Sequence, residues 1–201
     1  MNRTFAILAA SLLAASAQAA DSGTQQGIGL LVAPKIGFYK TTTDLSGAFY
    51  AGAEIGYRLP FLDRHLVLAI DGSWQQPHLI GIPSDPQITM GGVYVLHEQQ
   101  LGFNLLALYR FDKMFGALTP YAGAGPGAVY HRATMEAYGQ TYVETETKFG
   151  AEADVGAEYA LGPGAAFLEL HYHFTRVDFL STGNVHVGGF LAAGAGYRFQ
   201  F

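Results

Sequence analysis

Apolar and polar residues alternate along most of the chain with a period of two residues. This periodicity predicts β-strands, because successive side chains of a strand point to opposite faces. Eight antiparallel strands are expected, at residues 27–39, 48–59, 65–75, 100–111, 119–131, 148–161, 166–175 and 185–201. The sequence therefore predicts an all-β, up-and-down architecture in which an even number of strands closes into a barrel.

The composition of the two strand faces indicates what surrounds this barrel. None of the eight apolar faces carries a charged residue, whereas the opposite faces are sparsely charged and rich in glycine. A soluble barrel would place its charges outside, so this arrangement predicts an apolar exterior in lipid around a crowded polar interior. Aromatic residues gather near both strand ends, as two interfacial girdles require: Tyr57, Tyr109, Phe111, Tyr121, Tyr159, Tyr197 and Phe199 at one, and Phe38, Phe49, Trp74, Phe149 and Phe174 at the other.

The connections between the strands predict how the barrel is oriented. Those at residues 60–64, 112–118 and 162–165 are short and are expected in the periplasm, whereas those at residues 40–47, 76–99, 132–147 and 178–184 are expected outside the cell. Residues 132–147 are expected to extend the strands on either side and to turn near Tyr138-Gly139-Gln140.

The first 19 residues have the pattern of an export signal. Asn2 and Arg3 begin it, an apolar run follows, and Ala17-Gln18-Ala19 fits the small-residue cleavage site. We expect a signal peptide at residues 1–19 and one barrel domain at residues 20–201. Export followed by barrel formation predicts localisation in the bacterial outer membrane.

Composition excludes several other classes of protein. Charged residues make up 13% of the 201 residues and hydrophobic residues 50%, which argues against intrinsic disorder. The chain has 11 Lys and Arg against 16 Asp and Glu, a net charge of −5, and no basic cluster for nucleic acid. It has no cysteine, which excludes disulfides, thiolate metal sites and a cysteine nucleophile.

Two segments resemble the small eight-stranded outer-membrane barrels of Gram-negative bacteria, the group of the OmpA barrel, OmpX, OmpW and the opacity proteins. These are Pro120-Tyr121-Ala122-Gly123-Ala124-Gly125 and the chain end, residues 194–201. The chain ends with aromatic residues at every second position, Tyr197, Phe199 and Phe201. This pattern is similar to the signal that the barrel-assembly machinery recognises. Leu96-His97-Glu98 and the segment 105–111 resemble the OmpW subgroup.

An eight-stranded barrel has room inside for side chains and little else, so a wide porin channel is not expected. Opposite charges on the inward faces should neutralise one another, because an isolated buried ion is costly. We predict a lumen charge network, acting as a structural belt or as a gate, made of Lys35, Glu54, Arg58, Asp71, Arg110, Lys148, Glu152, Asp154, Glu158, Glu169 and Arg198.

Catalysis and cofactor binding have little support in the sequence. Glu169, His171 and His173 share one strand face and form a candidate metal-ligand set, but hydrogen-bonded interior side chains are the favoured interpretation. No metal and no cofactor is expected. The pattern of a lipid A-modifying hydrolase is absent, so we expect no enzyme.

The leading functional hypothesis is the binding or passage of small hydrophobic molecules. Segment 76–99 is too apolar for a solvated loop, and exposed apolar patches mark contacts. Its candidate ligand contacts, with those of the lumen, are Leu79, Ile80, Ile82, Leu106, Leu108 and Phe190. The alternative is a structural or surface-contact barrel with a plugged lumen. Expected partners are outer-membrane lipid and lipopolysaccharide, the assembly machinery during biogenesis and a small hydrophobic solute, with the barrel a monomer.

Overall fold

The computed structural model describes residues 29–42, 45–81, 94–111, 115–137, 139–179, 185–187 and 189–201. The predicted signal peptide lies outside these residues. Among them no helix is long and apolar enough to cross a membrane. The elements are β1 (Leu30–Thr41), β2 (Ala48–Arg58), the short 3₁₀ helix η1 (Leu62–Arg64), β3 (Leu66–Gln75), β4 (His78–Gly81), β5 (Tyr94–Arg110), β6 (Leu118–Ala137), β7 (Gln140–Leu161), β8 (Gly164–Phe174), β9 (Val177–Phe179), β10 (Val185–Val187) and β11 (Phe190–Gln200).

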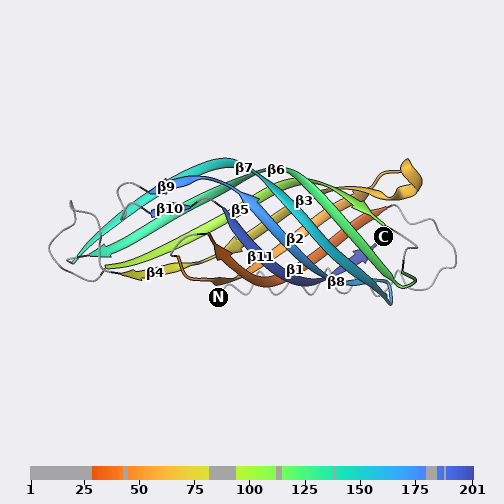
Figure 1. Ribbon diagram of the computed structural model, residues 1–201, viewed down its shortest axis with the longest axis horizontal. Helices are drawn as coiled ribbons and strands as arrows, with labels where there is room; N and C mark the ends of the chain where they lie inside the picture. The colour runs from red at the N-terminus through yellow and green to blue at the C-terminus, as the bar shows by residue number, and fades with distance from the viewer. Residues whose placement is uncertain are drawn as a thin grey trace.

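The long strands form one antiparallel sheet that closes on itself (Figure 1). The order around the sheet is β3-β2-β1-β11-β8-β7-β6-β5, and β5 pairs again with β3. The short strand β4 and strand β3 both pair with β5, one after the other along its length. The two therefore count as one position in the barrel wall. The predicted eight-stranded transmembrane barrel is therefore confirmed.

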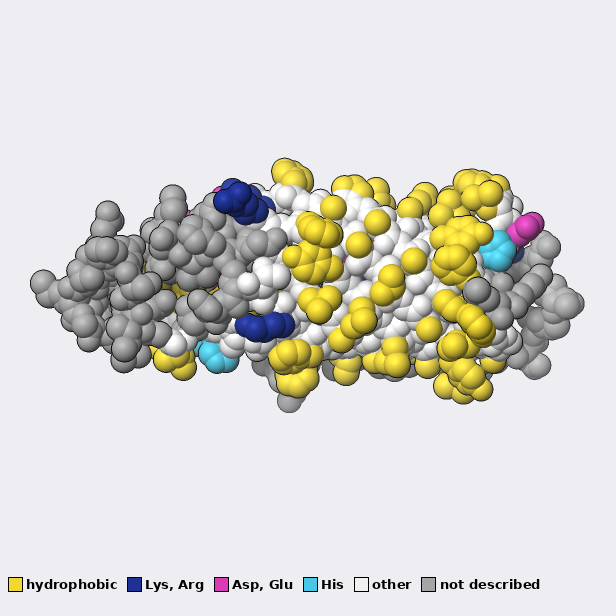
Figure 2. Space-filling model, viewed as in Figure 1, with side chains coloured by type: hydrophobic (Ala, Val, Ile, Leu, Met, Phe, Trp, Pro, Cys, Tyr) yellow, Lys and Arg dark blue, Asp and Glu magenta, His cyan; other side chains and the backbone are white. Residues whose placement is uncertain are grey.

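The outer surface of the barrel is apolar between two aromatic belts, as the alternation predicts. Ile36, Ile55 and Leu168 are among the exposed side chains, at 69%, 56% and 69%, and Figure 2 shows hydrophobic side chains covering the middle of the barrel. Along β7, the ten residue steps from Phe149 to Tyr159 span about 33 Å, which at a tilt of about 40° is about 25 Å of membrane thickness. This matches the apolar band of an outer-membrane barrel.

The two ends of the barrel differ. At one, here called the short-turn end, η1 joins β2 to β3, a turn at Gly162 joins β7 to β8, and the carboxyl terminus lies close by (Figure 1). At the other, the extended end, β6 and β7 continue past β8 as a hairpin that turns at Gly139, and β5 stays paired with β6 as far as Glu136. Here the prediction for residues 132–147 is confirmed.

In two other connections that the sequence predicts as loops, the structure has paired strands. Within residues 76–99, β4 pairs with the beginning of β5, and residues 177–179 pair with residues 185–187 as β9 and β10. The last predicted strand is thereby divided, because β10 pairs with β9 and the barrel strand β11 begins after Gly189. Gly189 has φ +150°, and a Cβ there would lie 2.6 Å from the Tyr172 hydroxyl, so only glycine fits this break.

Strand β6 faces the opposite way from the prediction. Tyr121, expected in an outer aromatic girdle, is buried inside, where its hydroxyl donates to Glu169 Oε2 at 3.1 Å. The error arose because glycines alternate with alanines along β6, so neither face shows which side is apolar. The inward glycines leave space for side chains of other strands, such as Asn104 on the neighbouring strand β5 beside Gly127.

Candidate functional site

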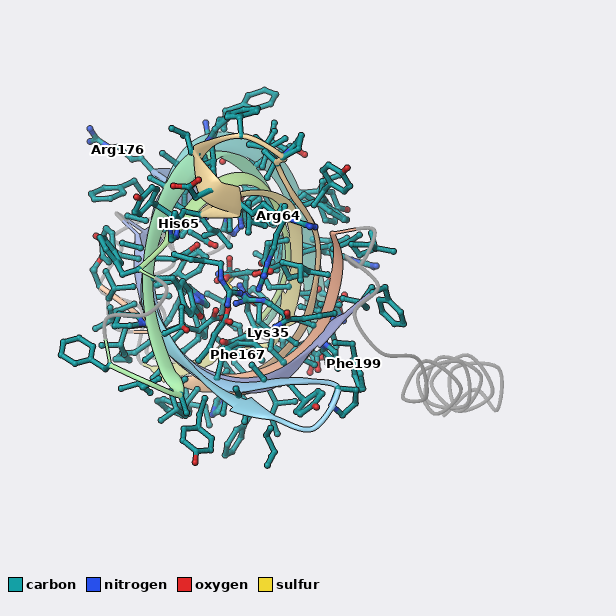
Figure 3. All side chains as sticks on the ribbon, turned by 90° about the vertical axis from the view of Figure 1, so that its right-hand side faces the viewer. Lys35, Arg64, His65, Phe167, Arg176 and Phe199 are labelled. Atoms are coloured by element: carbon teal, nitrogen blue, oxygen red, sulfur yellow. The ribbon has the colours of Figure 1, made fainter. Side chains whose placement is uncertain are left out.

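The bore of the barrel holds most of the charged residues in its walls. They occupy inward positions on β1, β2, β3, β5, β7, β8 and β11, because every second residue of a strand points to the same face. Seen along the barrel in Figure 3, Lys35 and Phe167 point into the ring and Phe199 points out. The predicted network residues that the structure buries are Lys35, Glu54, Asp71, Arg110, Glu152, Asp154, Glu158, Glu169 and Arg198.

Arg198 organises the charges nearest the short-turn end. Its guanidinium donates to Glu54 Oε2 at 2.8 Å and to Glu158 Oε1, and Arg110 reaches the other oxygen of Glu158 at 2.6 Å. The Arg198 guanidinium also lies over two rings, with centroids 5.0 Å away for Tyr121 and 4.8 Å for Phe167. Two guanidinium groups thus face two carboxylates, and this layer is electrically balanced.

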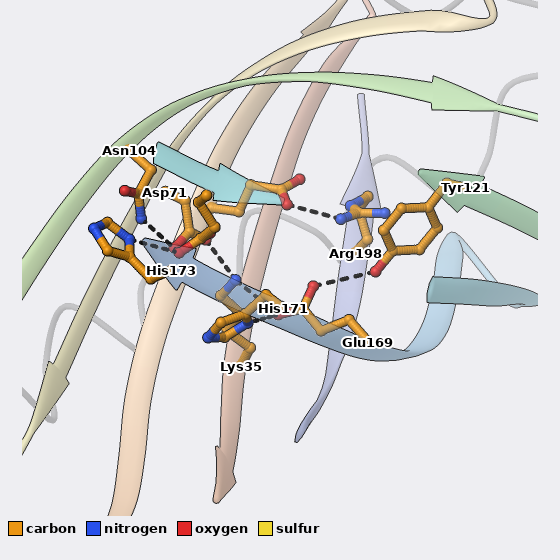
Figure 4. A network of polar contacts seen from close by, with 10 residues as sticks. Lys35, Asp71, Asn104, Tyr121, Glu169, His171, His173 and Arg198 are labelled. Atoms are coloured by element: carbon orange, nitrogen blue, oxygen red, sulfur yellow. Dashed lines mark hydrogen bonds and ion pairs between the residues drawn. The ribbon is translucent and has the colours of Figure 1, made fainter. Parts of the chain in front are cut away.

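Lys35 organises the next layer (Figure 4). Its ammonium group lies 2.6 Å from Asp71 Oδ2 and 2.7 Å from Glu169 Oε1. Since Glu169 also accepts the hydrogen bond from Tyr121, whose ring lies under the Arg198 guanidinium, the two layers form one connected network.

The two histidines of the metal-ligand set predicted from the sequence face different carboxylates. His171 Nδ1 lies 3.7 Å from Glu169 Oε1, whereas His173 Nδ1 lies 3.3 Å from Glu152 Oε2, which also accepts a hydrogen bond of 2.9 Å from Asn104. The residues whose ligand atoms all lie within 4.8 Å of one another are instead Glu152, Asp154 and His171.

Two predicted network residues lie apart from the buried group. Arg58 is half-buried at the short-turn end and donates to Gln200 at 3.1 Å. Lys148 is about 40% exposed and pairs with Glu146. Strand β7 pairs with β8 only from Ala151 onward. Lys148 therefore lies in the part of β7 that belongs to the hairpin.

A further buried polar group, at the extended end, was missed by the sequence analysis. Glu98 Oε1 lies 2.6 Å from His131 Nδ1 and accepts a hydrogen bond from Gln100, which in turn accepts one from Gln75. These positions continue the parity of β5, whereas the sequence analysis predicts a loop at residues 76–99. Extending the alternation backward from Gln100 through Glu98 to Leu96 would have found them.

The described candidate hydrophobic-ligand contacts of the lumen lie in two separate clusters. Leu106 and Leu108 pack with Leu31, Val67 and Ala69, whereas Phe190 belongs to a separate cluster with Tyr39, Tyr50, Val129 and Ala192. Ile80 is exposed at 64%. Ile82 and the side chain of Leu79 lie outside the described part of the structure.

These clusters and ion pairs close the bore. Lys35, Glu54, Asp71, Glu158, Glu169 and Arg198 are each at most 5% exposed. A water-filled channel would expose the side chains that line it, and these side chains are not exposed.

The comparisons with known proteins agree with this architecture. Residues 5–199 match the family described as outer membrane protein beta-barrel domain. Among solved structures, Neisserial surface protein A aligns with a TM-score of 0.53 and 20% identity over 88% of this chain and 100% of that one. A major outer membrane protein of Thermus thermophilus aligns with a TM-score of 0.59 and 10% identity over 86% and 99%.

At these identities the structural likeness shows the fold alone. Among curated proteins, none matches the sequence significantly. The family match covers nearly the whole chain, and the apolar band, the aromatic belts and the filled polar bore are those of a membrane-spanning barrel. The chain therefore belongs to the outer membrane protein β-barrel family and resides in the outer membrane.

Proposed function

We propose that the barrel is a non-conducting structural and surface-contact protein of the outer membrane. The observation that carries this proposal is the near-complete burial of the Lys35 and Arg198 layers, whose side chains are at most 5% exposed. Ion pairs between strands two positions apart around the barrel hold these layers in place. Solute flow through the bore would require those pairs to separate, and isolated buried charges are costly.

A non-enzymatic role is part of the proposal. His171 and His173 are buried beside carboxylates in the bore, on the side of the wall away from lipid. A lipid-modifying hydrolase would need a nucleophile with its base at the lipid interface.

The hairpin of β6 and β7 is the proposed contact surface. With the short turns in the periplasm, the extended end lies outside the cell. From Phe149 to Gln140, β7 covers about 30 Å, which raises the hairpin about 20 Å above the apolar band at the usual tilt. Tyr142 and Val143 on this hairpin are 48% and 53% exposed, which suits a protein or polysaccharide contact.

Planar-bilayer recordings test the closed bore. We expect no current steps from the wild type, and steps from the double variant Glu54→Ala/Arg198→Ala. This variant removes one charge of each sign from the Arg198 layer and leaves Glu158 paired with Arg110. The matched control is Arg132→Ala/Glu136→Ala, which removes the same charges from exposed positions of the hairpin. A wild type that conducts as readily as the Glu54/Arg198 variant contradicts the proposal.

A second candidate function, binding of a small hydrophobic molecule from the membrane, rests on a different observation. A groove of about 700 Å³ lies on the lipid-facing surface. Small side chains of β11, Ala193 and Ala195, form its floor, and Ile36, Leu168 and Leu170 border it. The groove lies between the two aromatic belts, where a solute dissolved in the bilayer core would reach it.

Photolabelling tests this second function. A diazirine-bearing alkane, activated with the protein in vesicles, is expected to label the groove residues of the wild type. Filling the floor with Ala195→Leu should reduce this labelling several-fold. Ala53→Leu, an equivalent change on the outward face of β2, serves as the control. Equal labelling of both variants along the whole lipid face contradicts a specific site.

The proposed partners follow from the outer surface. Outer-membrane lipid and lipopolysaccharide would contact the apolar band, with the barrel as a monomer. We keep Tyr197, Phe199 and Phe201 as the proposed assembly signal. Tyr197 and Phe199 pack edge to face with ring centroids 4.7 Å apart and are half-buried, so their outward surfaces remain accessible.

A further inference from the structure

The middle of the bore holds more acid than base. In the described structure, Asp154 lies in the electrostatic field of three other carboxylates, Asp71, Glu152 and Glu169, and of one ammonium group, Lys35. Among these five groups, four carboxyl groups share a single ammonium group. The neighbouring Arg198 layer pairs two guanidinium groups with two carboxylates, so the surplus of carboxyl groups is local. In a low-dielectric interior such a surplus is relieved by protons or by a bound cation.

Three side chains in this layer converge. Asp154 on β7 faces His171 on β8 in the strand register, and Glu152 lies two residues before Asp154 on the same face. Their ligand atoms all lie within 4.8 Å of one another. The three residues are 3%, 5% and 4% exposed for Glu152, Asp154 and His171.

Each of the three presents a polar atom that the described protein does not satisfy. Glu152 Oε1, Asp154 Oδ1 and His171 Nδ1 are buried without a hydrogen-bond partner. The nearest carboxylate to His171 Nδ1 outside the cluster is Glu169 Oε1, at 3.7 Å. Buried polar atoms are nearly always paired with protein, water or an ion, so three unpaired atoms in one cluster leave a place for a bound water or cation. An anion is excluded by the surrounding carboxylates.

We propose that Glu152, Asp154 and His171 bind a divalent transition-metal cation, of which Zn²⁺ is the representative. Two carboxylate oxygens and one imidazole nitrogen suit such an ion, and a small contraction of the cluster brings them to bonding distance. Asn104 and His173 both contact Glu152 Oε2 and would orient that carboxylate. A dication would be attracted by the carboxyl groups that the single ammonium group of Lys35 does not balance.

This ligand set differs from the one the sequence suggested. Glu169 is held by Lys35 and Tyr121, and His173 by Glu152. The site also stands apart from the proposed function, since a barrel that conducts could hold the ion equally well.

Metal titration of the purified full chain in detergent micelles tests the proposal. After treatment with a chelator, the wild type is expected to bind one Zn²⁺ by calorimetry and to unfold at a higher temperature with the ion than without it. Asp154→Asn should weaken binding about tenfold or more. The same variant should also lose the rise in melting temperature that Zn²⁺ gives the wild type, whereas replacing a merely structural Asp154 would leave that ion-dependent rise in place.

The control is Asp71→Asn, the same substitution in the same layer at a residue outside the ligand set. It should retain Zn²⁺ binding. Equal affinities of the two variants, or no binding by the wild type, would overturn the proposal. The absorption spectrum of the wild type loaded with Co²⁺ provides an answer independent of any variant: intense visible absorption of a four- or five-coordinate ion supports the site, and a spectrum identical to that of the aqueous ion overturns it.

Discussion

Replacing Arg198 with alanine is expected to destabilise the folded barrel by about 3–5 kcal/mol, the cost of breaking a buried ion pair from one side. The substitution leaves Glu54 without its guanidinium partner and Glu158 with Arg110 alone. It also removes the cation that lies over the rings of Tyr121 and Phe167. Urea unfolding in lipid vesicles, followed by tryptophan fluorescence, measures this loss.

Two controls separate the buried pair from charge loss in general. Arg176→Ala removes an exposed arginine and should change the stability by less than about 0.5 kcal/mol. Combining Arg198→Met with Glu54→Gln should recover much of the stability, because Glu158 keeps Arg110 as its partner and neither carboxylate is left as an unpaired buried charge. If Arg198→Ala is as stable as Arg176→Ala, the Arg198 layer does not hold the bore together.

Gly125→Ala is expected to destabilise the barrel by about 3 kcal/mol through overpacking. An added Cβ would overlap the backbone carbonyl oxygen of Leu105 and come within 3.1 Å of the Leu106 Cα atom. The neighbouring strand therefore has to move. The pairing of β5 with β6 skips this point, since Pro126 has no N–H to donate, and the two backbones approach closely here.

Gly72→Ala is the matched control for this prediction. It lies in strand β3, and the nearest atom to its added Cβ is 3.9 Å away, so the alanine fits and should be neutral or slightly stabilising. The fraction of heat-modifiable protein on unheated gels, together with urea midpoints, compares the two. Equal midpoints for Gly125→Ala and Gly72→Ala would contradict a close approach at Gly125.

The barrel could be predicted from sequence because its signal is repeated eight times. In β2, for example, Phe49, Ile55 and Tyr57 are exposed to lipid while Glu54 between them is buried. The alternation did not reveal the orientation of strand β6, because the side chains of glycine and alanine are too small to distinguish an apolar face from a polar one. It also missed the division of the last strand, because alternation alone does not reveal which strand Val185–Val187 pairs with.

The members of the bore network were largely predictable, whereas their partners were not. Parity places Lys35 and Glu169 inside, but only the order of strands around the barrel brings β1 within reach of β8 across β11. The same holds for Asp154 and His171, which face each other through the β7–β8 register. Lys148 shows the converse limit: its parity was inward, but β8 no longer pairs with β7 at that point, and the side chain is partly exposed. The OmpW resemblance remains a prediction.

The ion pairs inside the bore also bear on how the chain folds. Lys35 and Glu169 are 134 residues apart in sequence, and Glu54 and Arg198 are 144 apart. Both pairs join one of the first two strands, β1 or β2, to one of the last two barrel strands, β8 or β11. Neither pair can form until β11 is in place and β1 has paired with it. Until then these charges remain hydrated, and the open sheet is less stable than the finished barrel. Contacts of such long sequence separation make folding slow, and they make the final closure, rather than the growth of the sheet, the step that commits the chain to its native state.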